Sequence, residues 1–119
     1  MQRRFRLTRS EDFKRVRRSG KSYAHPLVVL IALKSEKSDQ PRVRVGVAAG
    51  RTVGTAVTRN RTKRLLREAM RTLILDIASG FDLILIARPG LASASLEETR
   101  QAVLQLLQRA KILNPVHES

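Results

Sequence analysis

The segment from Thr55 to about Asp76 carries apolar side chains on one face and cations on the opposite face. An α-helix turns by about 100° per residue, so side chains three and four positions apart share a face. At this spacing the small and apolar residues form one stripe, which consists of Thr58, Thr62, Leu65, Leu66, Ala69 and Leu73. The stripe predicts a helix that packs into a protein core, and therefore a folded domain rather than a disordered basic tail.

The opposite face of this helix presents a row of cations with almost no neutralising acid. Its members are Arg59, Lys63, Arg64, Arg67 and Arg71, gathered around Asn60, with Arg61 at the border. Like charges four residues apart destabilise a helix by about 0.2–0.5 kcal/mol per pair, so a face that meets only solvent usually mixes signs. We therefore interpret the row as a binding surface for a polyanion, with most contacts to phosphates. A merely solvated face is the alternative.

The charge of the whole chain is segregated in the same way. The 119 residues include 24 Lys and Arg against 10 Asp and Glu, which gives a formal charge of +14. Nine cations and two acids lie within residues 1–21, and nine cations and one acid lie within residues 42–71. The rest of the chain holds six cations and seven acids and is therefore almost neutral. Solubility does not require such segregation of sign, so the pattern favours a nucleic-acid partner.

Around the central helix the sequence predicts one α+β domain over residues 1–119, with a mixed sheet of about four strands packed by three helices. The expected helices are residues 11–18, begun by a capping box at 8–11 or by Ser10, the central helix, and a last helix begun by a capping box at 95–98. The expected strands are 23–33, 42–47 and 81–87, with a further short strand near 50–53. We expect the basic segment 1–9, the loop 34–41 and the tail 114–119 to be mobile.

Several classes of function are excluded or disfavoured. The chain has no cysteine, which excludes disulfides, thiol chemistry and cysteine-based zinc sites. No apolar run approaches the ~18 residues of a membrane helix, and the basic first residues lead into no apolar segment, so we expect a cytoplasmic protein without membrane association. Carboxylates are sparse and neither His25 nor His117 has an evident partner, which disfavours an enzyme that acts alone. A ribosomal protein or a general RNA chaperone stays open as an alternative.

The central helix also resembles a known sequence signature. The run TAVTRNRTKRLLRE over residues 55–68 resembles the RNR signature of the protein subunit of bacterial ribonuclease P. Flanking runs agree with that family in the same order, namely FRL at 5–7, EDF at 11–13, RVGV at 44–47 and DLILIAR at 82–88. The resemblance spans about residues 3–110.

The resemblance implies a fold shared with a small-subunit ribosomal protein and with domain four of elongation factor G. It includes a left-handed β-α-β crossover around the signature helix. The resemblance also implies that the chain binds the catalytic RNA subunit of ribonuclease P and the 5′ leader of precursor tRNA, and so promotes removal of the leader. The RNA would hydrolyse the substrate with Mg²⁺, so the protein would hold no catalytic residue, metal or cofactor of its own. We predict no obligate protein partner.

The resemblance assigns roles to individual positions. The expected contacts with the catalytic RNA are Arg59, Asn60, Arg61, Lys63, Arg64 and Arg67, together with Arg51 in the turn before the helix. The leader groove of the family lies between its first helix and its sheet, where Phe13 matches an aromatic residue. Arg17 and Ile31 stand where family members often carry aromatic residues. We therefore expect Phe13, Arg17 and Ile31 to contact the leader, and the alternative is that Phe13 is only a core residue.

Overall fold

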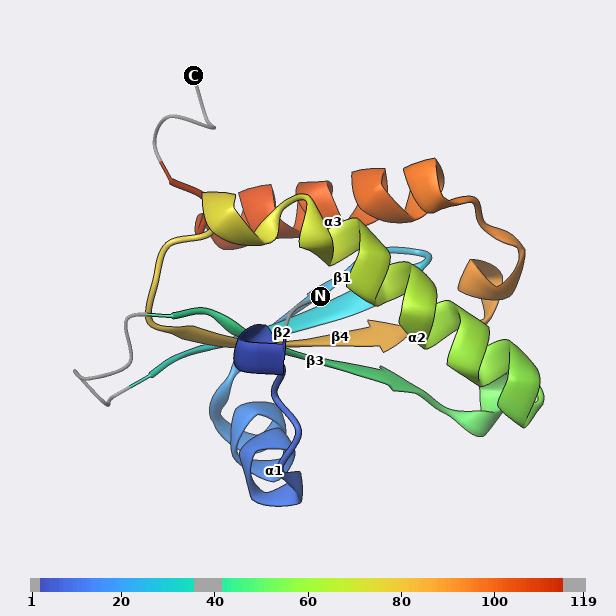
Figure 1. Ribbon diagram of the computed structural model, residues 1–119, viewed down its shortest axis with the longest axis horizontal. Helices are drawn as coiled ribbons and strands as arrows, with labels where there is room; N and C mark the ends of the chain where they lie inside the picture. The colour runs from blue at the N-terminus through green and yellow to red at the C-terminus, as the bar shows by residue number, and fades with distance from the viewer. Residues whose placement is uncertain (1–2, 36–41, 115–119) are drawn as a thin grey trace.

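Three helices enclose one mixed sheet (Figure 1). The computed structural model describes residues 3–35 and 42–114. Its helices are α1 (Ser10–Ser19), α2 (Ala56–Arg71) and α3 (Leu96–Ala110), and its strands are β1 (Lys21–Ala24), β2 (Val28–Lys34), β3 (Arg44–Ala49) and β4 (Phe81–Ala87). Short 3₁₀ helices lie at Arg3–Phe5, Arg51–Val53, Ile74–Asp76 and Pro89–Ser93. None of the described helices is long and apolar enough to cross a membrane.

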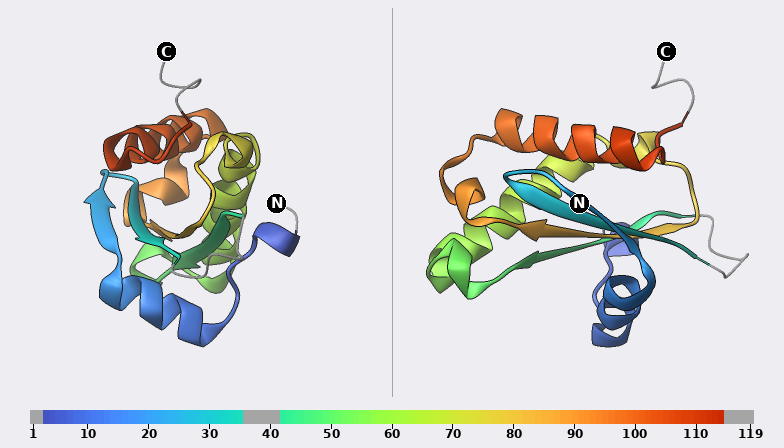
Figure 2. Two further views of the ribbon diagram at one scale, coloured as in Figure 1. Left: turned by 90° about the vertical axis from the view of Figure 1, so that its left-hand side faces the viewer. Right: turned by 180° about the vertical axis from the view of Figure 1, so that it is seen from behind.

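The order of strands in the sheet is β1-β2-β4-β3. β2 pairs antiparallel with both β1 and β4, whereas β3 pairs parallel with β4. α2 connects the two parallel strands, and the view along the sheet shows that this crossover is left-handed (Figure 2). The single domain with three helices and a four-stranded mixed sheet confirms the predicted fold class.

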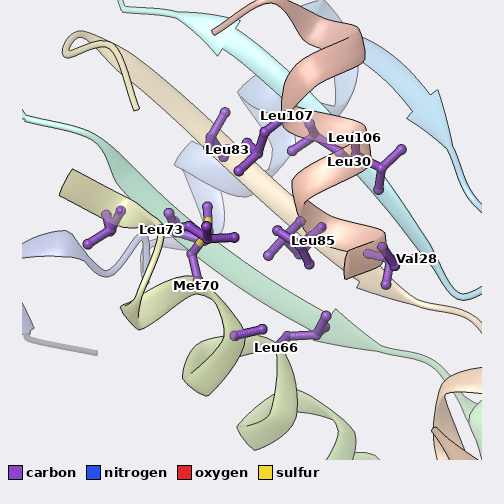
Figure 3. Packing of buried hydrophobic residues seen from close by; sticks show 14 of the residues in the cluster. Val28, Leu30, Leu66, Met70, Leu73, Leu83, Leu85, Leu106 and Leu107 are labelled. Atoms are coloured by element: carbon purple, nitrogen blue, oxygen red, sulfur yellow. The ribbon is translucent and has the colours of Figure 1, made fainter. Parts of the chain in front are cut away.

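The larger core lies between the sheet and the helices α2 and α3, which cover the same face (Figure 1). Figure 3 shows how this core is filled, with side chains from α2, α3 and the two central strands pointing toward one another. Its fully buried members include Leu30, Leu66, Met70, Leu83, Leu85, Leu106 and Leu107. The apolar stripe of α2 is therefore in the protein interior, as the sequence predicts, and the cations of α2 lie away from it.

α1 covers part of the opposite face of the sheet over a second, smaller core. Val16 of α1 packs there with Ile31 of β2, Ile84 of β4 and Leu7 from the N-terminal segment. The Leu7 N–H donates to the Val45 carbonyl at 2.9 Å, and the neighbouring residue forms a parallel bridge to β3. Within the segment 1–9, which we expected to be mobile, residues 6 and 7 thus pair with the edge strand, and residues 1–2 lie outside the described residues.

The other segments expected to be mobile fall largely outside the described residues. These are residues 36–41 of the predicted loop and residues 115–119 of the predicted tail. The first residue of that tail, Asn114, donates its N–H to the Asp76 carbonyl at 2.8 Å. The chain is therefore held to the body of the domain at least as far as residue 114.

Four charged side chains join α1 to the sheet beside the smaller core. Asp82 of β4 is fully buried, and Arg44 of β3 donates to both of its carboxylate oxygens at 3.0 Å. Arg15 of α1 donates to the same carboxylate and also pairs with Asp12 at 3.2 Å. Burial raises the pKa of Asp82, but the hydrogen bonds from Arg44 and Arg15 outweigh this effect, so its pKa is lowered overall. The network therefore fixes the position of α1.

We expect Asp82→Asn to lower the free energy of unfolding by at least about 2 kcal/mol at neutral pH, because it leaves two guanidinium groups without their buried partner. A carboxylate whose pKa is lowered by folding stabilises the protein above its unfolded pKa, and this contribution disappears as pH falls through the folded value. The difference between the wild type and the variant should therefore shrink below about pH 4. Urea titrations of both proteins at several pH values measure this difference in the free energy of unfolding. A difference that does not change with pH would contradict the lowered pKa of Asp82.

The structure corrects four local predictions. The segment predicted as one strand over 23–33 is a hairpin of β1 and β2, because the turn around Pro26 interrupts the pairing. Residues 51–53 form a 3₁₀ helix instead of a strand, and α2 ends at Arg71, before a separate 3₁₀ turn. α1 begins after Arg9 without a side-chain cap, so the predicted capping box at 8–11 is wrong. The capping box at Ser95 and Glu98 is confirmed by both of its hydrogen bonds.

Candidate nucleic-acid interface

The N-terminus of α2 is built by a glycine and a threonine. Gly54 adopts a φ of 145°, which side-chain-bearing residues rarely reach, and it turns the chain out of the preceding 3₁₀ helix. The Thr55 hydroxyl then accepts from the Thr58 N–H at 3.3 Å and caps the helix. A helix leaves the N–H groups of its first turn without partners inside the helix, and here Ala56 and Val57 of that turn are exposed, an arrangement that favours phosphate.

The face around Asn60 carries four of the predicted RNA contacts together. Asn60 and Arg64 are exposed, while Arg59 and Lys63 are partly exposed. Arg59, Asn60 and Lys63 line a hollow of about 210 Å³ with Ala49 and Ala56, at the end of β3. The buried Nε of Arg59 has no hydrogen-bond acceptor among the described residues. We call Arg59, Asn60, Lys63 and Arg64 the Asn60 face.

Two of the cations predicted for this row are engaged by the protein itself. The guanidinium of Arg61 donates to the Ala92 carbonyl in the 3₁₀ helix Pro89–Ser93. Arg71 pairs with Glu68 at 2.7 Å, and this hydrogen bond lowers the pKa of Glu68 and raises the pKa of Arg71. Arg61 thus lies beside the Asn60 face rather than in it. Arg51 is exposed in the 3₁₀ helix before α2, near the start of the face.

Arg67, the last predicted RNA contact, lies in a different place. It lines a second hollow of about 210 Å³, which we call the Phe13 hollow, and the other lining residues are Arg6, Leu7, Thr8, Phe13, Val45, Gly46 and Val47. The N-terminal segment, α1, β3 and α2 all contribute to it. Partial burial lowers the pKa of Arg67, and repulsion from Arg6, which lines the same hollow, lowers it further.

The predicted leader-binding residues are separated by the structure. Phe13 is partly buried and lines the Phe13 hollow, and Arg17, one turn later on α1, is exposed. Ile31 is only 8% exposed and packs beneath α1 against Val16 and Ile84. The prediction that Ile31 contacts a ligand is therefore corrected, because α1 covers it.

The sheet face beyond α1 is not fully covered. Val29, Ile86 and Ala48 are paired across β2, β4 and β3, and all three are partly exposed. The next row, which contains Ile31 and Ile84, is buried under α1. The helix therefore leaves an apolar strip of sheet open on the side where a leader groove is expected.

Six of the eight residues that line the Phe13 hollow were absent from the sequence-based site, and Arg6, Thr8 and Gly46 are among them. Gly46 has a detectable signal, because a glycine inside a strand often marks a close approach by another group. A Cβ at position 46 would lie 2.4 Å from the Cζ of Phe13, so the tip of the ring occupies the space that the glycine leaves. Arg6 and Thr8 have no such signal, because only the pairing of the N-terminal segment with β3 brings them to the hollow.

The chemistry available on this surface is that of cations, amide groups and an aromatic ring. Such groups bind phosphates, riboses and unstacked bases. Within residues 3–35 and 42–114, no three His, Asp or Glu side chains gather into a group that could hold a metal ion. The surface therefore has the composition of an RNA-binding interface.

Comparison with known proteins gives a consistent result. The family model described as ribonuclease P matches residues 1–111. The ribonuclease P protein component of Herpetosiphon aurantiacus is 44% identical over 112 residues, covering 94% of this chain and 89% of that protein. The corresponding protein of Brevibacillus brevis is 41% identical and covers 98% and 93%.

Solved structures agree in fold. The ribonuclease P protein of Staphylococcus aureus superposes with a TM-score of 0.80 at 27% identity, covering 92% of this chain and 98% of that chain. The ribonuclease P protein of Thermotoga maritima superposes with a TM-score of 0.76 at 30% identity, covering 87% and 96%. The similarity in fold therefore extends over 87–92% of this chain.

Proposed function

The chain belongs to the family of bacterial ribonuclease P protein components, and on that premise we propose that it binds the catalytic RNA subunit and the 5′ leader of precursor tRNA. Binding of both would promote endonucleolytic removal of the leader during tRNA maturation. The observation that carries the proposal is the Asn60 face, where cations without carboxylate partners among the described residues flank an exposed amide.

The Asn60 face suits folded RNA for two reasons. Its guanidinium and ammonium groups can contact successive phosphates of a rigid backbone, which gives affinity and register rather than sequence readout. Asn60 can donate hydrogen bonds to, and accept them from, a base edge or a 2′-hydroxyl. The 2′-hydroxyl is the group that distinguishes RNA from DNA. The opposite side of α2 is packed into the core, so RNA would meet a surface that is already ordered.

The second part of the proposal is the division of labour within the holoenzyme. The catalytic RNA would supply the hydrolytic site and bind the Mg²⁺ ions that the reaction needs. The protein would reduce electrostatic repulsion between two polyanions and hold the leader beside α1, where Phe13 and Arg17 lie. No side chain of this chain is then required for the chemical step.

Precursor-tRNA cleavage at low Mg²⁺ tests the proposal. We expect the catalytic RNA alone to be nearly inactive under these conditions, because cations must screen the repulsion between the two RNAs. Addition of the protein should restore cleavage at the 5′ end of the mature tRNA. The catalytic RNA alone at high Mg²⁺ is the control for its folding.

The same assay separates the proposal from a general RNA chaperone. A chaperone would accelerate folding of the catalytic RNA but would add nothing once that RNA is folded. If the protein fails to stimulate cleavage by RNA folded beforehand at high Mg²⁺ and then returned to low Mg²⁺, the proposed function is wrong.

A further inference from the structure

α1 crosses a face of the sheet on which the rows of side chains differ in chemistry. Alternate residues of a strand share a face, so paired residues of neighbouring strands form rows across it. One row pairs Asp82 of β4 with Arg44 of β3, and we call it the charged row. Two rows further along, Ile86 is paired with Val29 and Ala48 in the apolar strip that stays open. α1 therefore contacts the charged row and leaves the apolar strip uncovered.

Hydrophobic packing alone favours the opposite arrangement. The underside of α1 carries Val16, which is fully buried, and Phe13. Each Å² of apolar surface removed from water contributes about 25 cal/mol, whereas withdrawing a charge from water is costly unless the charge is paired. A helix with this underside would bury more apolar surface over Val29 and Ile86 than over a carboxylate and a guanidinium group. Another interaction therefore sets the position of α1 along the strands.

That interaction is the group of four charged side chains beside the smaller core, which we call the ion network. Its members are Asp12, Arg15, Arg44 and Asp82. Arg15 lies 2.5 Å from Asp82 and 3.2 Å from Asp12. Arg44 lies 3.0 Å from Asp82 and 3.7 Å from Asp12. Each arginine is thus shared by both acids, and the four charges cancel, which is the condition under which buried charges are tolerated.

The two ends of α1 are held to different degrees by the chain itself. At the C-terminal end, Gly20 lies so close to β2 that a Cβ there would come within 2.7 Å of the Ile31 side chain. At the N-terminal end, the exposed residues 8–9 separate α1 from the residue that pairs with β3. Asp12 and Arg15 belong to the N-terminal half of the helix. The ion network therefore acts on the half of α1 that the chain holds less closely.

We propose that the ion network is a positioning device, which holds the N-terminal half of α1 over the charged row and so keeps the apolar strip open for the leader. The proposal rests on the function proposed above. It makes Asp12 and Arg15 positioning residues, which act through α1 rather than by touching RNA. Without their contacts α1 would pivot about Gly20 and cover the apolar strip. Affinity for the leader would then fall, because only the open arrangement accepts it.

A thiol placed on the apolar strip measures whether the strip is open. The chain has no cysteine, so Ala48→Cys introduces a unique thiol at a partly exposed position. The rate of its alkylation by iodoacetamide is measured in the free protein, with and without Arg15→Met. This second substitution removes the contact from α1 to the sheet. Arg44 still donates to both carboxylate oxygens of Asp82, so the buried acid keeps a partner.

We expect Arg15→Met to slow alkylation at position 48 about fivefold, since the closed arrangement would then hold about four-fifths of the molecules. Arg15→Lys keeps a cation in the ion network and should restore most of the rate. Asp12→Asn is a second variant that should slow alkylation as well, and urea unfolding checks that every variant is folded.

Lys14→Met is the matched control, because Lys14 is exposed on α1 and its replacement removes the same charge. It should leave the alkylation rate unchanged. A rate that neither Arg15→Met nor Asp12→Asn lowers would overturn the inference. A rate that Lys14→Met lowers equally would also overturn it, because loss of charge alone would then explain the effect.

Affinity for the leader provides the second readout. Each protein without the added thiol is assembled with the catalytic RNA, and its affinities for a precursor tRNA and for the mature tRNA are compared. Arg15→Met should reduce the ratio of these affinities about fivefold, in parallel with the alkylation rate, and Arg15→Lys should recover it. An unchanged ratio despite slower alkylation would overturn the inference.

Two other outcomes of these measurements have distinct meanings. A reduced ratio with an unchanged alkylation rate would mean that Arg15 contacts the leader directly, and the positioning role would be wrong. A wild-type ratio near one would contradict the proposed function itself, whereas the alkylation rate would still test what holds α1 in place.

Discussion

Lys63→Glu combined with Arg64→Glu is expected to weaken binding of the catalytic RNA by about 100-fold or more. Each substitution removes a charge-assisted contact and introduces a charge that repels phosphate, and a contact of this kind contributes about 1.5–3 kcal/mol. Folding should be retained, because Arg64 is exposed and Lys63 is partly exposed at the surface of α2. Equilibrium binding to the catalytic RNA and urea unfolding of the free variant measure the two effects.

A control for the charge reversal is Lys111→Glu at the end of α3, which is compared with Arg64→Glu alone so that each variant changes the net charge by two. Lys111 is exposed and lies outside the Asn60 face, so its reversal changes the net charge without removing a proposed contact. We expect it to alter RNA affinity far less than the change in α2. Equal losses of RNA affinity would show that the partner responds to net charge alone. If the double variant no longer unfolds cooperatively in urea, Lys63 and Arg64 support the fold instead.

Leu66→Ala is expected to have the largest effect on stability, a loss of about 2–5 kcal/mol in the free energy of unfolding. Leu66 is fully buried between α2 and the sheet, so the truncation leaves a cavity in the larger core (Figure 3). The neighbouring residue Leu65 is partly exposed and provides the control, since Leu65→Ala should cost less. Urea titrations of both variants measure the difference, and equal losses would mean that α2 is rotated from the orientation described.

The sequence is most informative about α2. Its apolar stripe and its cations follow one helical period, so the buried side and the exposed side are separated by local geometry alone. The exposure of Asn60 and Arg64 and the burial of Leu66 follow from this pattern. Leu65 lies at the margin of the stripe. The uniform rotation of about 100° per residue does not show whether a side chain at that margin is buried.

The sequence is less informative wherever a distant segment decides the outcome. Arg61 points to the Ala92 carbonyl, which lies 31 positions away and has no sequence signal as an acceptor. Ile31 is hidden because α1 crosses its part of the sheet, which strand periodicity does not show. Arg67 lies at the Phe13 hollow, which forms only because the pairing of residues 6 and 7 with β3 brings the N-terminal segment there.

The buried ion network illustrates the same limit. Asp82 follows Phe81 at the start of a nearly continuous apolar strand, and the sequence alone offers no partner for it. The parallel register places Arg44 directly beside it, and Arg15 arrives from α1. Long-range pairing thus turns an isolated acid into the group that fixes α1, and so fixes one side of the groove expected to hold the leader.

The central claim is that the Asn60 face docks on the phosphates of folded RNA, and the salt dependence of binding tests it most directly. The affinity of the protein for the catalytic RNA is measured at fixed Mg²⁺ over a range of monovalent salt concentrations. We expect the logarithm of the affinity to fall linearly with the logarithm of salt concentration, with a slope of about −0.7 to −0.9 per phosphate contacted. The Lys63→Glu and Arg64→Glu double variant should show a shallower slope. An affinity that does not change with salt would contradict the claim.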